Sequence, residues 1–196
     1  MNGILQQWNA AMGRLVDAVQ PAVVQVHNGH QGTGAGTVWH PDGLILTNAH
    51  VARQREVMVT LADGRRLPGK VLAADPALDL AAVGVDASGL ATIEIGDSRQ
   101  LAAGDWVLAL GHPWGVRGAA TAGVVAGAGA RLPEMPGNGR EWIAVSLHLR
   151  PGHSGGPLVD VHGRLVGINT MMAGPDLGLA VPVHVVKGFL RRALSS

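Results

Sequence analysis

The sequence contains no cysteine, and this absence excludes disulfide bonds and thiolate metal ligands from the chain. It also contains no block of like charges, and the formal net charge of its 196 residues is +1. A nucleic-acid-binding face needs clustered basic residues, so we expect no nucleic-acid partner. No apolar run reaches the roughly 20 residues of a membrane-spanning helix, so we expect no membrane span in this chain.

Features of an export signal are also lacking at the start of the chain. No basic segment precedes the first apolar residues, and Gln6, Asn9 and Asp17 interrupt the apolar pattern. We therefore expect a cytoplasmic protein, or an exported one if the sequence is a segment of a longer chain. The missing cysteines do not decide between these two compartments.

The residues that are abundant favour a strand-rich fold. Apolar residues make up 47% of the chain, which is enough for a buried core. The 29 glycines and 11 prolines favour short strands and turns over long helices. A chain of this length forms one domain or two small subdomains that share a cleft.

Helical periodicity is confined to the two ends of the chain. Apolar residues recur at steps of three and four over residues 4–19, and Pro21 ends this helix. We expect its apolar stripe to pack on the body of the same molecule. The alternative is an oligomer contact anchored by Trp8, for example in a homotrimer. A second helix is expected at residues 184–194.

Between these helices, runs of alternating or continuous apolar residues separated by turn residues predict two strand-rich halves. We divide the chain into an N-terminal helix at 1–20, a first half at 21–85, and a second half with the C-terminal helix at 86–196. The expected strands are residues 22–27, 37–40, 44–47, 56–61, 67–74, 79–83, 106–111, a pair within 119–130, 142–148, 157–160, 164–172 and 178–183.

A glycine-rich segment at residues 32–36 reads as a turn. It lacks the third glycine and the following helix of a dinucleotide-binding loop, so we reject a cofactor site there.

Ser154 lies in a second glycine-rich segment, between two extended stretches. Glycine permits the tight turns that aim backbone N–H groups at an oxygen that becomes charged during acyl transfer. If the chain had no base and no orienting acid elsewhere, an ordinary glycine-rich loop would explain the segment equally well. His50 follows a buried strand, and Asp79 opens another apolar strand, where a buried carboxylate needs a partner. The order His, Asp, Ser is one of the known orders of a catalytic triad.

Three blocks that contain these residues resemble the catalytic blocks of trypsin-like serine proteases, above all those of the HtrA (Deg) branch. They are residues 47–51 (Thr-Asn-Ala-His-Val), 79–81 (Asp-Leu-Ala) and 152–158 (Gly-His-Ser-Gly-Gly-Pro-Leu). Further matches occur at residues 21–24, 110–115, 167–170 and 178–182. The resemblance implies an all-β, chymotrypsin-type fold of two six-stranded antiparallel barrels, with short helices at the N- and C-termini.

The resemblance also implies a mechanism that needs no metal or cofactor. Ser154 would be the nucleophile, His50 the general base and Asp79 the group that orients His50. The oxyanion hole would lie at Gly152, His153 and Ser154, with the N–H groups of Gly152 and Ser154 as donors.

By the same resemblance, the pocket for the side chain before the cut lies between the residues preceding Ser154 and a later strand. No carboxylate occurs in either stretch, so we expect a preference for small or medium aliphatic residues and, as substrates, unfolded or misfolded polypeptides. His148 is the residue that would make this pocket smaller or more polar. The expected wall residues, with Leu149 and Ile168 nearest the substrate, are His148, Leu149, Arg150, Ile168, Asn169, Thr170, Met171 and Met172.

The chain departs from the family in two respects. The family usually has Asn before the nucleophile, where this chain has His153. Family members also commonly carry an anchor or export signal and PDZ domains, and we expect no PDZ-based regulation within this chain. Two other classes stay open: a non-catalytic peptide-binding module on the same fold, and an α/β-hydrolase esterase built on a Gly-x-Ser-x-Gly elbow.

Overall fold

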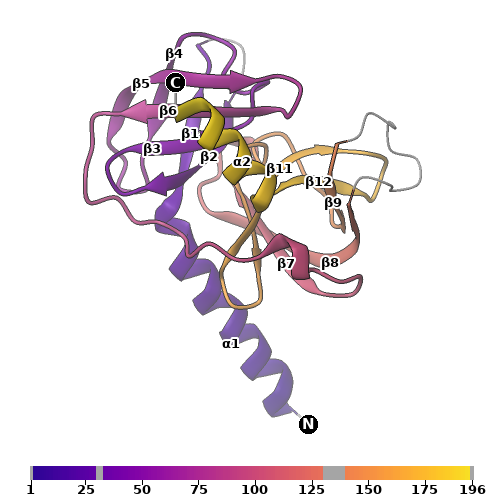
Figure 1. The fold of residues 1–196 in the computed structure, drawn as a ribbon. Coiled ribbons are helices and arrows are strands. Elements are labelled where there is room, and N and C mark those ends of the chain that lie inside the picture. The colour runs from indigo at the N-terminus through magenta and orange to yellow at the C-terminus, as the bar shows by residue number, and fades with distance from the viewer. Residues whose placement is uncertain (1, 30–32, 130–139, 195–196) are drawn as a thin grey trace.

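The protein is described by a computed structural model, which covers residues 2–29, 33–129 and 140–194. The first half of the chain forms a closed antiparallel barrel with the strand order β1-β2-β3-β6-β5-β4 (Figure 1). Its strands are β1 (Val23–His27), β2 (Thr33–His40), β3 (Leu44–Thr47), β4 (Glu56–Thr60), β5 (Arg66–Asp75) and β6 (Leu80–Val85).

The second half forms another closed antiparallel barrel, with the order β10-β11-β12-β9-β8-β7. Its strands are β7 (Trp106–Gly111), β8 (Ala119–Gly129), β9 (Trp142–Ser146), β10 (Pro157–Asp160), β11 (Leu165–Met172) and β12 (Gly178–Pro182). The predicted fold of two six-stranded barrels is therefore confirmed. The division of the chain at residues 20 and 85 stays a prediction.

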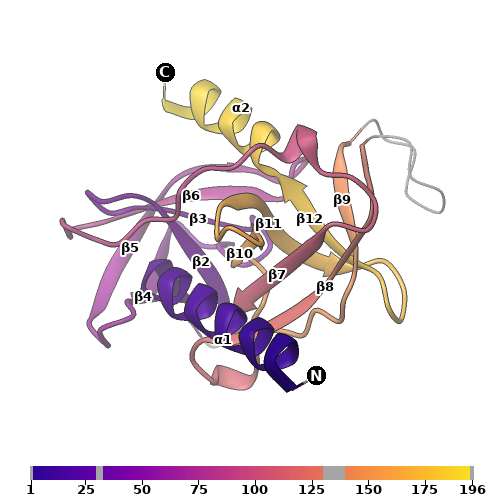
Figure 2. The same ribbon diagram turned by 90° about the horizontal axis from the view of Figure 1, so that it is seen from below.

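In the described residues, two α-helices and three short 3₁₀ helices complete the fold. Helix α1 (Asn2–Val19) leaves the body of the molecule at its N-terminal end, and α2 (Val183–Leu194) lies over strands of both barrels (Figures 1 and 2). Neither described helix combines the length and the apolar character that crossing a membrane requires. The 3₁₀ helices are η1 (Gln20–Ala22), η2 (Ser98–Gln100) and η3 (Pro113–Gly115).

Helix α1 packs on the body as expected over all but its first turns. Leu15 and Val19 are buried, whereas Ile4 and Leu5 near the N-terminus are exposed. Trp8 lies between these regions and meets Trp106 of β7 edge to face, with ring centroids 5.6 Å apart. The apolar stripe is thus covered by the same chain over its last turns and uncovered over its first.

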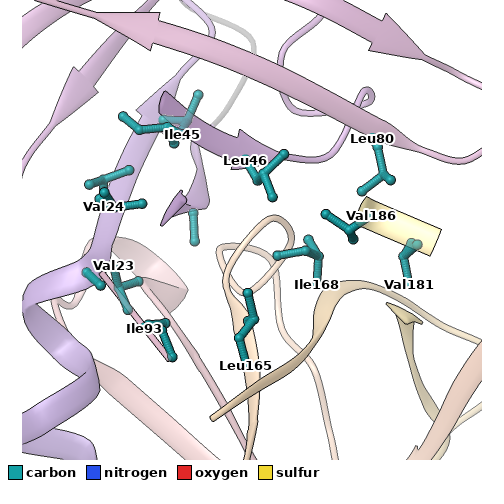
Figure 3. Packing of buried hydrophobic residues seen from close by; sticks show 14 of the residues in the cluster. Val23, Val24, Ile45, Leu46, Leu80, Ile93, Leu165, Ile168, Val181 and Val186 are labelled. Carbon is teal, nitrogen blue, oxygen red and sulfur yellow. The ribbon is translucent and has the colours of Figure 1, made fainter. Parts of the chain in front are cut away.

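The barrels share one buried cluster. It contains β1, β3 and β6 residues of the first barrel together with β11 and β12 residues of the second (Figure 3). Strand β6 is buried along nearly its whole length, because a barrel strand that also faces the other barrel has no solvent side. Residues that carry this contact include Leu46, Leu80, Leu165, Ile168, Val181 and Val186 of helix α2.

Two strand predictions were wrong, both in segments rich in small residues. Residues 33–36 belong to β2 instead of forming the predicted turn, and residue 32 lies outside the described chain. Glycine is required at position 34 by close packing, because a Cβ would lie 2.6 Å from Val51 Cγ1. Residues 119–129 were read as a strand pair but form the single long strand β8, since Ala and Gly give no clear periodicity there.

Candidate active site

The turn between β5 and β6 presents Asp79 to the ring of His50. Asp79 was predicted to open a strand, but it is the last turn residue before β6 and has a φ of 55°. This left-handed conformation is unusual for a residue other than glycine. The side-chain amide of Asn48 donates to the carbonyl oxygen of Asp79 (2.9 Å), which holds the turn in place.

Asp79 fixes both the position and the tautomer of His50. The carboxylate can only accept hydrogen bonds, so His50 Nδ1, 2.8 Å from Asp79 Oδ2, must carry the proton. The backbone N–H of His50 donates to Oδ1 of the same carboxylate (3.1 Å). In a neutral ring, Nε2 is therefore unprotonated and able to act as a base.

Thr170 is a further partner of Asp79, 91 residues away in the sequence. Its Oγ1 donates to Asp79 Oδ2 (2.5 Å), from β11 of the second barrel. Burial alone would raise the pKa of Asp79, but the hydrogen bonds from His50 and Thr170 outweigh burial and hold this pKa below its ordinary value. The carboxylate thus remains charged beside His50.

Ser154 and His50 line the same cavity, which has a volume of about 450 Å³. Ser154 Oγ donates to the carbonyl oxygen of Thr170 (2.7 Å), not to His50 Nε2, in this resting arrangement. A rotation about the Ser154 side chain is needed to bring Oγ to the imidazole. Catalytic hydrogen bonds are commonly loose before substrate binds, so this geometry is compatible with catalysis.

The segment before Ser154 is a tight turn. The N–H of His153 donates to the carbonyl oxygen of Arg150 (2.9 Å), with Pro151 and Gly152 between them. Gly152 has a φ of 106°, and Pro followed by Gly with positive φ is the pattern of a type II turn. Within the described chain, the N–H groups of Gly152 and Ser154 have no acceptor, so both are available to an oxyanion in the cavity.

Two buried histidines, His153 and His112, form hydrogen bonds that stabilise this turn. The N–H of Arg150 donates to Nδ1 of His153 (3.1 Å), so the ring and the backbone of His153 both bind the backbone of Arg150. The backbone N–H of His112 donates to the carbonyl oxygen of Gly152 (2.9 Å). Burial lowers the pKa of His153, and burial lowers the pKa of His112 to about 4, so both rings are neutral near pH 7.

The turn is also attached to the first barrel. The N–H of Ala35 in β2 donates to the carbonyl oxygen of Ser154 (2.8 Å). Gly155 follows with a φ of 87°, and a Cβ there would collide with the carbonyl oxygen of Ala35. This close backbone approach explains the glycine after the serine.

The expected wall residues separate into two groups. Leu149, Arg150, Thr170 and Met171 line the cavity with Met172. The others lie elsewhere: Ile168 and Asn169 are fully buried within β11, and the exposed ring of His148 faces the carbonyl oxygen of Pro175 (Nδ1 to O, 3.1 Å).

The prediction that Ile168 lies nearest the substrate therefore differs from the structure. Ile168 points into the core cluster that the barrels share, so the apolar wall of the cavity consists of Leu149, Met171 and Met172.

A second serine–histidine–acid group lies at the start of α2. His184 Nδ1 is 2.8 Å from Ser98 Oγ, and its Nε2 is 3.0 Å from Glu141 Oε2. Ser98 Oγ also accepts the backbone N–H of His184 (3.3 Å), which gives this helix N-terminus a cap from a distant segment. The side chain of Ser98 is buried, whereas that of Glu141 is 47% exposed.

A two-barrel fold with His50, Asp79 and Ser154 around one cleft defines the class of trypsin-like serine peptidases. The family model described as the trypsin-like peptidase domain matches residues 34–168, so the chain belongs to this family.

Named relatives place the chain among HtrA-type serine proteases. It is 37% identical over 165 residues to the mitochondrial serine protease HTRA2 of Drosophila pseudoobscura pseudoobscura, covering 82% of this chain and 39% of that protein. It is 39% identical over 164 residues to a protein of Ectopseudomonas mendocina named as a DegP-like periplasmic serine endoprotease, covering 79% and 34%. The solved structure of the HtrA-type protease AlgW with a tripeptide superposes with a TM-score of 0.84 at 29% identity, covering 91% of this chain and 62% of that one. The chain thus spans less than half the length of these curated relatives.

Proposed function

We propose that this domain is a serine endopeptidase that cleaves unfolded or misfolded polypeptides by a triad of Ser154, His50 and Asp79. The observation that carries the proposal is the bond between His50 Nδ1 and Asp79 Oδ2 (2.8 Å) at the cavity that Ser154 also lines. This bond leaves Nε2 free to accept the serine proton.

The reaction follows from these groups. Ser154 Oγ turns from Thr170 to His50, loses its proton to Nε2 and attacks the peptide carbonyl carbon. The carbonyl oxygen becomes an oxyanion and accepts hydrogen bonds from the N–H groups of Gly152 and Ser154, worth about 3 kcal/mol or more per donor. His50 then gives its proton to the leaving amine, and water repeats the sequence to release the acyl group.

We further propose that the residue before the cut is a small or medium aliphatic one. Leu149, Met171 and Met172 supply an apolar wall, and a Lys or Arg side chain placed there would be desolvated without a carboxylate partner. His148, the residue that could have made the pocket polar, is turned toward Pro175. Aliphatic side chains become accessible when a protein unfolds, which supports unfolded polypeptides as the substrate class.

The other candidate is a peptide-binding module that has lost catalysis. The hydrogen bond from Ser154 to Thr170, instead of to His50, is the observation that favours it. The α/β-hydrolase esterase is excluded, because the chain forms two antiparallel barrels.

Labelling with a fluorophosphonate probe separates these candidates. We expect wild-type protein and Ser98→Ala to be labelled, Ser154→Ala to remain unlabelled, and the labelled proteins to degrade unfolded casein. Absence of labelling in folded wild-type protein would favour the binding module. Profiling of cleavage sites in a denatured protein mixture tests the pocket, and dominant cleavage after Lys, Arg, Asp or Glu would contradict the aliphatic preference.

A further inference from the structure

The cavity at Ser154 has a second wall, contributed by the first barrel. That wall comprises Asn28, Thr33, Gly34, Val51 and Arg53, and His50 stands beside it. His50 delivers its proton to the leaving amine, so the residues that follow the cut must pass His50 and this wall. The first-barrel wall therefore contacts the leaving side of a substrate, across the cleft from the apolar wall.

Charge in this cavity is of one sign. Arg53 and Arg150 are its arginines, and of the described residues that line it none is Asp or Glu. The carboxylate of Asp79, which is bonded to His50, is 9% exposed. It already accepts hydrogen bonds from His50 and Thr170, so it does not neutralise the arginines at the cavity surface.

Arg53 is held in position beside the reacting groups. Its Nε donates to the carbonyl oxygen of His50 (2.9 Å), which uses only one of its N–H donors. Among described residues, no carboxylate forms an ion pair with the rest of the guanidinium. A guanidinium fixed at one edge keeps a planar pair of donors that matches a carboxylate.

The guanidinium of Arg150 is a second cation, and it belongs to the cavity wall contributed by the second barrel. Its guanidinium carbon lies 5.0 Å from the ring centroid of Trp114, a contact that leaves the edge of the guanidinium open. Arg150 also begins the turn that supplies the oxyanion donors. A carboxylate on the leaving side thus meets positive charge from both walls.

We propose that Arg53, assisted by Arg150, forms a carboxylate subsite for an Asp or Glu side chain at the first or second residue after the cut. The subsite rests on the proposed peptidase function. The position follows from reach: an extended chain advances about 3.3 Å per residue, and Arg53 is bonded to the backbone of His50 itself. The selectivity is modest, because the ion pair is open to water.

The test uses amidated peptides with Val before the cut and Asp, Asn or Lys after it. We expect wild-type kcat/KM to favour Asp over its isostere Asn by about threefold to fivefold, and less at high salt. Arg53→Gln should bring the Asp:Asn ratio to about one. Arg53→Glu should make the Lys peptide a better substrate than the Asp peptide. The control Arg55→Gln changes a nearby exposed arginine that does not line the cavity and should keep the wild-type ratio. An equal Asp:Asn ratio in wild type and Arg53→Gln would overturn the proposal.

A second arm identifies the source of the carboxylate. Peptides that end two residues after the cut are compared as free acids and as amides. A gain that appears only with the free terminal carboxylate would overturn the side-chain assignment.

A third measurement separates the subsite from catalysis. Binding of the Asp and Asn peptides to Ser154→Ala is followed by fluorescence anisotropy, and we expect tighter binding of the Asp peptide that depends on Arg53. Asp-selective binding without any cleavage by wild-type protein would retain the subsite and overturn the peptidase function. Cleavage without Asp selectivity in either assay would do the reverse.

Discussion

The groups around Ser154 and Ser98 contain the same three kinds of side chain in different settings. Around Ser154, the acid is buried, its histidine lines the cavity together with the serine, and the N–H groups of Gly152 and Ser154 have no acceptor among the described residues. Around Ser98, the acid is half exposed, the histidine faces the serine through Nδ1, and the serine is buried as a helix cap.

A serine, a histidine and an acid in hydrogen-bonding order are therefore not sufficient to define a catalytic site. A serine–histidine hydrogen bond is present in the Ser98 group, at 2.8 Å, whereas Ser154 is bonded to a carbonyl oxygen. Of the two groups, the Ser154 group is the one that lines a cavity together with backbone N–H groups able to bind an oxyanion. Paired substitutions in the two groups test which of these features catalysis requires.

The largest contrast is expected between the two acids. Asp79→Asn should lower kcat by about 10⁴-fold, because the amide favours the wrong tautomer of His50. The matched change Glu141→Gln should leave kcat within about twofold, since it removes only an exposed acid. Both are measured as steady-state peptide hydrolysis. Comparable losses in the two variants would show that the Ser98 group takes part in catalysis.

The next effect concerns the histidines beneath the oxyanion turn. His112 has a pKa lowered from 6.5 to about 4, so the unfolded chain binds its proton more readily than the folded one. The contribution of His112 to the free energy of unfolding should have its full value above pH 6.5. It should decrease by on the order of 3 kcal/mol as the pH drops to about 4.

His112→Asn should flatten this dependence. Urea unfolding at pH 7 and pH 5 measures it, with His162→Asn, an exposed histidine, as the control. An equally steep dependence in His112→Asn would show that other groups cause the acid sensitivity.

A smaller effect is expected at the bond between the barrels. Thr170→Val removes the hydroxyl that donates to Asp79 and should lower kcat about tenfold, the value of one charge-assisted hydrogen bond. Thr170→Ser keeps the donor and should retain most of kcat. If the serine variant loses as much activity as the valine variant, the methyl group rather than the hydroxyl is what matters.

The smallest effect belongs to the Ser98 group. Ser98→Ala removes the cap from the first turn of α2 and should lower the free energy of unfolding by about 1 kcal/mol. Its peptide hydrolysis should match that of wild type. A loss of activity without a loss of stability would contradict the structural role assigned to Ser98.

The fold could be predicted from strand periodicity and from the resemblance of three ordered blocks. Prediction failed where small residues carry no periodic signal, as in β8, or where glycine serves close packing, as at Gly34 in β2. Those segments are shaped by their neighbours across the barrel, which a local pattern does not contain.

For the site, the blocks pointed to His50, Asp79 and Ser154, and in the structure His50 and Ser154 line one cavity while Asp79 is bonded to His50. The second role of Thr170 could not be predicted, because its bond to Asp79 joins residues 91 positions apart. Arg53 was missed for a different reason: an exposed arginine in a loop looks ordinary until its neighbour is known to be His50. The prediction for Ile168 was wrong because β11 contributes both to the cavity and to the core. Its sequence does not indicate which of its side chains face the core.

The bonds that tie Ser154 and Asp79 across the two barrels also determine what happens when this molecule begins to unfold. Ala35 to Ser154 and Thr170 to Asp79 are both inter-barrel bonds, and the barrels share one core cluster. Any opening that separates the barrels also separates Ser154 from His50. If Ser154 and His50 act as proposed, a molecule opened in this way no longer cleaves peptides.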